Sequence, residues 1–237
     1  MTSVGGHPRQ AELEATLTAH LDQARARRCA SKEHAIAVQT LCALGRHGEA
    51  AALLDRLAAM PAGTAEDDEA LGFAAFAAGA HQLSRDCYAR VVDARPDDPL
   101  AWYNLAAGER TIGQLEAAEA ACDQALRLSP GAYEAALLRS VLRTQTVDRN
   151  HVEALQGMLE RAAAPPAIIS LHYALGKEYG DVGDYDAAFH HFSCGATVRR
   201  QTLSYEVADD VAKLRRIIES FDAGRLALAP GLTPPAY

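Results

Sequence analysis

A unit of 34 residues that recurs along the chain limits the possible folds more than any other feature of its sequence. Glycines stand at the same position of four units, at Gly45, Gly79, Gly113 and Gly183. An amphipathic segment precedes each glycine and another follows it, which predicts two helices joined by a tight turn. Because one hairpin cannot bury its apolar face alone, the hairpins are expected to stack on one another.

The unit at residues 99–132 shows most clearly how a hairpin is expected to pack. Small side chains at Ala106, Ala118 and Ala125 allow two antiparallel helices to approach closely. Large side chains are expected to fill the volume around them: Trp102, Leu105 and Leu115. The order of these residues, with a closing Pro130, resembles the tetratricopeptide repeat (TPR). The resemblance continues in register through three further units, at residues 31–64, 65–98 and 169–202.

The expected fold is therefore all-α, a right-handed superhelical stack of about five TPR-like hairpins with a capping helix at each end. The unit at residues 133–168 is divergent, because no glycine marks its turn and the stretch 144–150 is polar. Its second helix is expected at His151–Ala163 and is expected to end before Pro165 and Pro166.

Two flanking segments show the pattern of amphipathic helices that would cover the ends of the stack. The N-terminal segment, at residues 10–28, places leucines four residues apart: Leu13, Leu17 and Leu21. The C-terminal segment, at residues 205–221, carries apolar residues at similar spacing: Val207, Val211, Leu214, Ile217, Ile218 and Phe221. Residues 1–9 are expected to be a disordered N-terminus, and residues 224–237 a tail or linker.

Composition and charge argue against several classes of protein. Alanine is the commonest residue and aromatic residues make up only 6%, which argues against a β-sandwich, a barrel or a parallel α/β sheet. The formal net charge of −8 argues against nucleic-acid binding. An apolar run of about 18 residues, which a membrane span needs, is absent. The N-terminal sequence lacks the apolar core of a signal peptide, so we expect a cytoplasmic protein with its five cysteines reduced.

The C-terminal half contains several motifs in a defined order: Asn150-His-Val152, Leu171-His-Tyr-Ala-Leu-Gly-Lys177, Asp181-Val-Gly-Asp-Tyr-Asp186, Ala188-Phe189 and Arg199-Arg200. With these motifs, the region from Tyr133 to Leu228 resembles the repeat region that precedes the catalytic domain of bacterial TPR–sulfotransferase proteins. In that family a Pro-Arg-Ser-Gly loop would follow and hold the sulfuryl donor. This sequence contains no such loop, so the resemblance implies an accessory region without catalytic or cofactor-binding residues.

The first helix of each hairpin is expected to line a concave groove, through the same few positions of every unit. Six residues at such positions are our candidates for partner binding: Phe73, Phe76, Tyr103, Arg110, Tyr173 and Lys177. Exposed aromatic side chains there would suit an extended or helical peptide, and a flanking helix that covers them is the equal alternative. In the divergent unit the groove positions fall at Glu134, Leu137, Val141 and Thr144.

Other polar clusters favour structural roles over sites. His190, His191 and Cys194 have a spacing that suits a metal ion, but Phe189 and Phe192 are expected to form the buried stripe of the same helix, so surface or packing roles are favoured. The acidic run at residues 66–69 is expected to stabilise a helix N-terminus, in preference to forming an acidic lip for a basic peptide. An intramolecular ion pair, for example with Glu134, is the favoured role of Arg139 and Arg143.

Together these features predict a non-catalytic protein–protein interaction module that binds a peptide or partner protein in its groove, without a metal, cofactor, nucleic acid or membrane. A chaperone-type carboxylate clamp is not expected, because only Lys32 and Asn104 of its Lys/Asn set are present. One alternative is the N-terminal part of a TPR–sulfotransferase enzyme whose catalytic domain is absent from this sequence. Another is a structural adaptor that forms a homo-oligomer through its end repeats.

Overall fold

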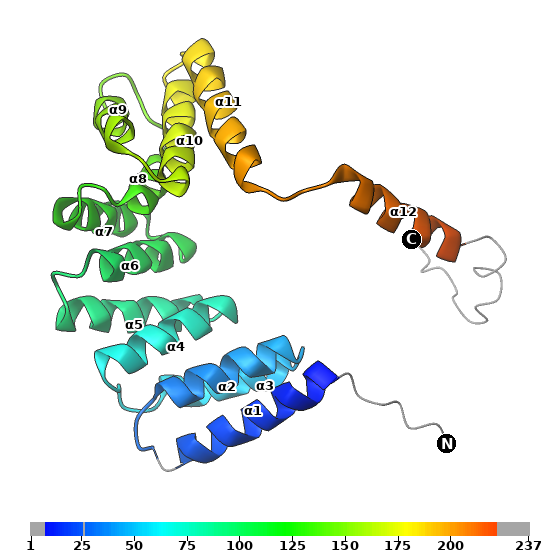
Figure 1. Ribbon diagram of the computed structural model, residues 1–237. Coiled ribbons are helices and arrows are strands. Elements are labelled where there is room, and N and C mark those ends of the chain that lie inside the picture. Colours follow the sequence, from blue (N-terminus) through cyan, green and yellow to red (C-terminus); the bar gives the residue numbers. More distant parts are fainter. Residues whose placement is uncertain (1–7, 26, 222–237) are drawn as a thin grey trace, which may run out of the picture.

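The computed structural model describes residues 8–25 and 27–221, and the regular elements in this part of the chain are helices, without a β-strand. Helix α1 (Pro8–Arg25) precedes five hairpins, and α12 (Val207–Ser220) follows them. The hairpins are α2 (Lys32–Ala43) with α3 (His47–Ala58), α4 (Ala65–Ala77) with α5 (His81–Ala94), α6 (Pro99–Thr111) with α7 (Leu115–Leu128), α8 (Tyr133–Val141) with α9 (Val152–Arg161), and α10 (Pro165–Asp181) with α11 (Tyr185–Thr202). Helices α1 to α11 form a curved stack, as Figure 1 shows, and the expected all-α superhelical fold is confirmed.

The repeated glycines form the turns of four hairpins, as the sequence predicts. Gly45, Gly79, Gly113 and Gly183 all have positive φ, between 73° and 87°. Side chains other than glycine strain the backbone in this region, so one residue type at one position fixes the same turn four times. The divergent hairpin has no such glycine, and a ten-residue segment at 142–151 joins α8 to α9 instead.

Small buried side chains set the distance between the paired helices. Ala106, Ala118 and Ala125 are fully buried, and Leu105 is also in the core. Gly108 of α6 is similarly close to its neighbour, since a Cβ there would lie 3.2 Å from the Cα of Arg85 in α5. The alanine excess of the sequence therefore serves the close packing of helices both within and between hairpins.

Two of the large residues expected in the core are less buried than predicted. Trp102 is half-buried against the core, and its indole Nε1 donates a 2.8 Å hydrogen bond to the carbonyl oxygen of Pro96. The prediction for Leu115 is wrong, because 41% of its surface is exposed. Leu115 is the first residue of α7, at the turn end of the hairpin, where the neighbouring helix no longer covers it.

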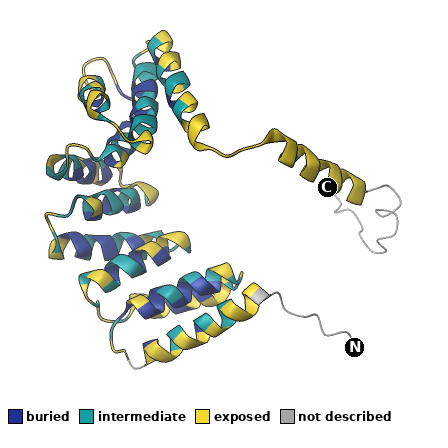
Figure 2. Ribbon diagram, viewed as in Figure 1, coloured by how far each residue is buried: buried dark blue, intermediate teal, exposed yellow. Residues whose placement is uncertain are grey.

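The two ends of the stack differ in how they are covered. At the N-terminal end, α1 packs on α2 and buries Leu17. At the other end, α12 was expected to cover α11, but none of its described residues is buried and Figure 2 shows it exposed along its length. The expected buried stripe of α11 is also wrong, since Phe189 is 74% and Phe192 43% exposed. For Phe189 the physical reason is the same, because the helix that would bury it points away. The Phe192 ring packs on its inner side against Gly176 of α10.

The sequence-predicted boundaries differ from the observed ones at a few points. Helix α9 ends at Arg161, and Pro165 begins α10, where a proline at the first helical position suits its missing N–H. The fifth hairpin thus starts four residues before the expected unit at 169–202. Most of the predicted disordered N-terminus and the whole predicted tail at 224–237 lie outside the described residues.

Candidate functional site

A hollow of about 300 Å³ lies where the first helices of three successive hairpins meet. Helices α6, α8 and α10 supply its lining: Tyr103, Arg110, Glu134, Leu137, Leu138, Val141 and Ser170. Leu138 is buried and Leu137 half-buried, whereas Val141 is 44% exposed, so the lining is apolar and open to solvent. Two of the six candidate residues, Tyr103 and Arg110, therefore meet in one concave site.

Tyr103 and the two charged residues give the hollow its polar character. Burial, and then the negative charge of Glu134, raise the pKa of Tyr103, so its hydroxyl stays protonated and can donate a hydrogen bond. Arg110 is exposed, and within the described part of the chain it has no ion-pair partner within 4.0 Å. The site thus combines an apolar wall with two charged side chains of opposite sign, Arg110 and Glu134.

A buried carboxylate holds two sides of this hollow together. Glu178 of α10 is fully buried and accepts hydrogen bonds from the Ser140 hydroxyl (2.6 Å), the His151 backbone N–H (2.5 Å) and the His151 Nδ1 (2.9 Å). Burial alone would raise the pKa of Glu178, but hydrogen bonds from His151 and Ser140 outweigh burial and lower that pKa. The ionised carboxylate therefore fixes α8 and the segment 142–151 against α10.

Lys177 belongs to this internal network and does not reach the hollow. Its ammonium group donates a hydrogen bond to the Arg143 carbonyl oxygen and pairs with Asp181 at 2.5 Å. Asp181 also accepts a 2.7 Å hydrogen bond from the Gln145 backbone N–H. Lys177 was selected as a groove residue, but its ammonium group contacts the backbone of the segment 142–151, at the Arg143 carbonyl oxygen. Its use by a partner stays a prediction.

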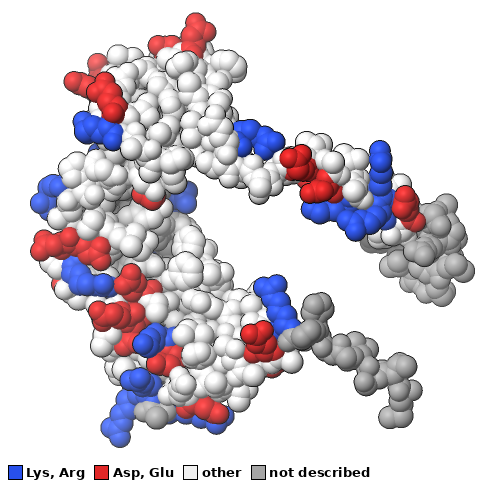
Figure 3. Space-filling view, viewed as in Figure 1, with Lys and Arg blue, Asp and Glu red and all other residues white. Residues whose placement is uncertain are grey.

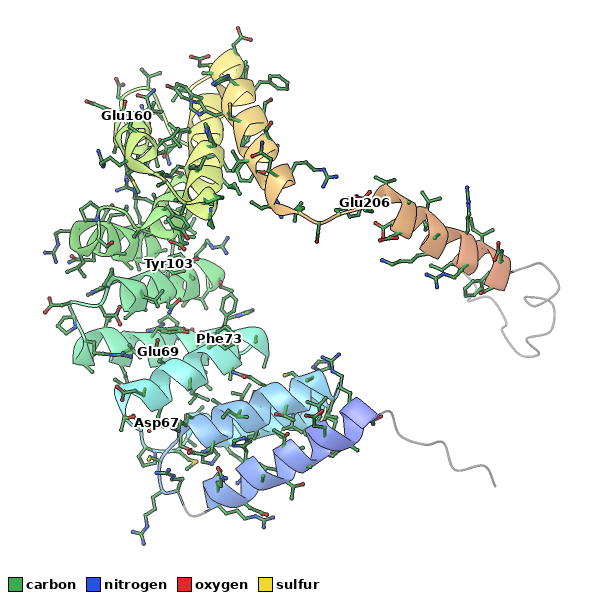
Figure 4. The ribbon with its side chains drawn as sticks, in the orientation of Figure 1. Asp67, Glu69, Phe73, Tyr103, Glu160 and Glu206 are labelled. Atoms are coloured by element: carbon green, nitrogen blue, oxygen red, sulfur yellow. The ribbon has the colours of Figure 1, made fainter. Side chains whose placement is uncertain are left out.

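The remaining three candidate residues lie apart from the hollow. Tyr173 packs between α10 and α11, with its ring 6.3 Å from that of Phe192. Phe73 and Phe76 lie on α4, 60% and 40% exposed, and the Phe76 ring makes an edge contact with His81. Figure 4 shows Phe73 and Tyr103 on neighbouring first helices. The described flanking helices leave Phe73 exposed, and its use by a partner stays a prediction.

The acidic run at residues 66–69 is used internally. Thr64 caps α4, and the Asp67 carboxylate completes the capping box by accepting a hydrogen bond from the Thr64 backbone N–H. Asp67 also accepts a 2.9 Å hydrogen bond from the Lys32 backbone N–H. Asp68 accepts two hydrogen bonds from Arg90, and Glu69 pairs with Arg95 at 2.6 Å. These contacts favour the expected structural role over an acidic lip.

Histidines cluster between α10 and α11 without forming a metal site. The Nδ1 atoms of His172 and His191 are 3.0 Å apart, and the Tyr179 ring stacks on His191. The Cys194 sulfur lies 3.7 Å from Nε2 of His190. Among the described residues, no three His, Cys, Asp or Glu side chains come together as metal ligands would. The cluster packs two helices against each other.

The arginines of the divergent hairpin form ion pairs with the preceding helix. Arg139 pairs with Asp123 at 2.8 Å and Arg143 with Glu119 at 3.1 Å. The expected intramolecular role is found, although the partners lie on α7 and Glu134 is not one of them. Glu134 is thereby left at the hollow.

Comparisons with known proteins support the fold. A model of the tetratricopeptide repeat matches residues 100–131. The structure titled MamA RS-1 ArsTM double mutant is 18% identical, with a TM-score of 0.51, and the match covers 80% of this chain and 98% of that one. The fold is a superhelical stack of TPR-like hairpins. The structure of YrrB, described as a TPR protein with an unusual peptide-binding site, is 14% identical with a TM-score of 0.50 over 78% of this chain and 93% of that one. No match was found among curated proteins.

The sequence identified only part of the hollow. Glu134, Leu137 and Val141 stand at the groove positions of the divergent unit, but the irregular register there gave no reason to select them. Ser170 holds the corresponding position in the next unit, and its small side chain did not indicate a binding role.

In the described part of the chain, no helix is long and apolar enough to span a membrane.

Proposed function

We propose that this chain is a non-catalytic protein-interaction module that binds a peptide segment of a partner protein in the hollow between α6, α8 and α10. The observation that carries the proposal is the hollow itself, a concave apolar surface built by three successive first helices and open to solvent. Its volume of about 300 Å³ is at the small end of ligand sites. It therefore suits one or two side chains of a peptide that continues along the groove.

The charges at the hollow indicate which peptide would bind. Leu137 and Val141 offer an apolar surface, and Arg110 offers a guanidinium group without a local ion-pair partner among the described residues. An apolar side chain in the hollow, followed by a carboxylate against Arg110, satisfies both features. The exposed ring of Phe73 on α4 offers a further apolar contact along the same groove. The solved structure described as having a peptide-binding site supports this type of use for the fold.

Selection from a library of random peptides tests the proposal without knowledge of the natural partner. The full chain serves as bait, and the affinity of each enriched peptide is measured by isothermal titration calorimetry. Arg110→Glu should weaken acidic peptides by at least about tenfold, the effect of losing one charge-assisted hydrogen bond. Val141→Asp should weaken the same peptides, because a carboxylate would lie in the apolar hollow.

Matched substitutions elsewhere separate a local effect from a general one. Arg161→Glu reverses an exposed charge on α9, and Val147→Asp changes a side chain that is 76% exposed in the segment 142–151. Both controls should bind as the unchanged chain does. Peptides that bind all four variants equally would overturn the site, and a library that yields no enriched peptide would overturn the function.

Three other predictions from the sequence, on a sulfotransferase role, the cellular location and nucleic acid, depend on separate observations. The role in recruiting substrates for a sulfotransferase depends on the resemblance of residues 133–228 alone, because the TPR match and the two solved structures concern the repeat. It stays a prediction. A cytoplasmic location and the exclusion of nucleic acid likewise stay predictions from charge and composition.

A further inference from the structure

The outer face of α11 has the form of a surface on which another helix packs. Phe189 occupies the unit position that Arg85 holds in α5. In α5, Arg85 lies against Gly108 of the following helix, α6. The same position of α11 carries an aromatic side chain, yet Phe189 is 74% exposed. No described helix follows α11 on this face, so the face has no partner within the described chain.

Helix α12 carries an apolar stripe of matching size that is also uncovered. Its apolar residues recur every three or four positions and so share one side of the helix: Val207, Val211, Leu214, Ile218 and Phe221. Leu214 is 58% and Ile218 71% exposed. Two amphipathic surfaces of this kind on one soluble chain indicate an interaction site.

The segment between the two helices holds α12 away from its own α11. Residues 203–206 have no helical structure, and Figure 1 shows α12 directed away from the stack. Arg200 stabilises this arrangement, since its guanidinium donates hydrogen bonds to the carbonyl oxygens of Leu203 (3.3 Å) and Tyr205 (3.1 Å). A short segment held extended favours exchange of the following helix between two copies over its folding back.

Charge complementarity gives the orientation of the pairing. Helix α11 has Asp186 in its first turn and Arg199 and Arg200 in its last. Helix α12 has Asp209 and Asp210 in its first turn, and Arg215 and Arg216 further along. Figure 3 shows the basic end of α11 and the acidic start of α12. Antiparallel packing brings Arg199 and Arg200 of α11 beside Asp209 and Asp210 of α12, whereas parallel packing would place Asp186 beside those two aspartates.

We infer that α12 of each copy docks antiparallel on the Phe189 face of α11 in a second copy, so that two chains form a symmetric dimer. The contact occurs twice because each copy gives one helix and receives one, which doubles the apolar area buried. The dimer uses a surface distinct from the hollow between α6, α8 and α10. A test of the dimer is therefore independent of a test of the proposed peptide binding.

Sedimentation equilibrium of the full chain tests this inference. The unchanged chain should have twice the 25.3 kDa mass of one copy. Leu214→Asp on α12 and Phe189→Asp on α11 should each give a 25.3 kDa monomer, because each places a carboxylate in the contact. Val147→Asp, a change of the same kind at an exposed residue of the segment 142–151, should remain a dimer. Circular dichroism of each variant checks that its helices remain intact.

Mixing the two monomeric variants distinguishes exchanged helices from other dimers. The Phe189→Asp chain has an intact α12 and the Leu214→Asp chain has an intact α11, so one of the two contacts can form between them. The mixture should contain a heterodimer that neither variant forms alone. Asp209→Lys should weaken the dimer, and Arg199→Glu in the same chain should restore it in part.

Several results would overturn the inference. An unchanged chain that is monomeric at every concentration would show that α12 has no partner in a second copy. A dimer that survives Leu214→Asp would use another surface. Loss of the dimer in Leu214→Asp but not in Phe189→Asp would place α12 somewhere other than α11.

Discussion

Replacement of Glu178 by alanine should destabilise the chain more than any exposed substitution, because this carboxylate is fully buried and accepts three hydrogen bonds. Its loss leaves the Ser140 hydroxyl and two N–H groups of His151 without their acceptor. A buried donor without a partner costs about 1–3 kcal/mol, and breaking a buried charged network typically costs about 3–5 kcal/mol. We therefore expect Glu178→Ala to lower the free energy of unfolding by about 3–5 kcal/mol.

Urea unfolding followed by circular dichroism measures this change, with Glu160→Ala as the matched control. Glu160 is exposed on α9, as Figure 4 shows, and its replacement should change stability by less than about 0.5 kcal/mol. Hydrogen exchange should show the greatest loss of protection in α8 and at residues 142–151. Equal stability of the two variants would refute the role given to Glu178.

Acid provides a second test of the same carboxylate. The pKa of Glu178 is lowered in the folded state, so the group stabilises the fold above its ordinary pKa of 4.5. This contribution is lost as the pH falls through the lower folded value. The free energy of unfolding should therefore fall less steeply below pH 4.5 in Glu178→Ala than in the unchanged chain. Parallel pH profiles would contradict this reasoning.

Two further predictions concern packing and pH. Trp102→Ala should lower the free energy of unfolding by about 2–3 kcal/mol, less than for a fully buried tryptophan, because Trp102 is half-buried; an unchanged urea midpoint would contradict this. Burial lowers the pKa of His172 and His191 below 6.5, so these residues stabilise the fold above that pH and the contribution is lost as the pH falls below it. His172→Asn should reduce the loss of stability between about pH 7 and pH 5.5, a range that includes the ordinary His pKa, measured by urea unfolding in the same buffers.

The repeat could be predicted from the sequence because each hairpin obeys local rules. The glycine turns at Gly45, Gly79, Gly113 and Gly183 need a positive φ, and alanines at fixed positions need close helix contact. Both requirements act within one unit or between neighbours, so a single sequence reveals them. Tyr103 and Arg110 could be selected for the same reason, since they stand in the most regular unit.

The rest depended on contacts between distant residues, which periodicity does not encode. An apolar stripe predicts an amphipathic helix but does not say which surface covers it, so α12 was wrongly expected on its own α11. Glu178 stands between Lys177 and Tyr179, and a glutamate beside a lysine in a helix is expected at the surface. In the structure Ser140 and His151 enclose it. Lys177 likewise has one partner, the Arg143 carbonyl oxygen, that lies 34 residues away in the chain.

The central claim is that a peptide binds in the hollow between α6, α8 and α10, and photochemical cross-linking tests it most directly. A peptide enriched in the library selection would carry a benzophenone beside its apolar residue, and mass spectrometry would locate the cross-linked residues in the full chain. We predict cross-links within Pro99–Thr111, Tyr133–Val141 and the first turns of α10. Cross-links confined to the second helices, such as α5, α7 and α9, would contradict the account.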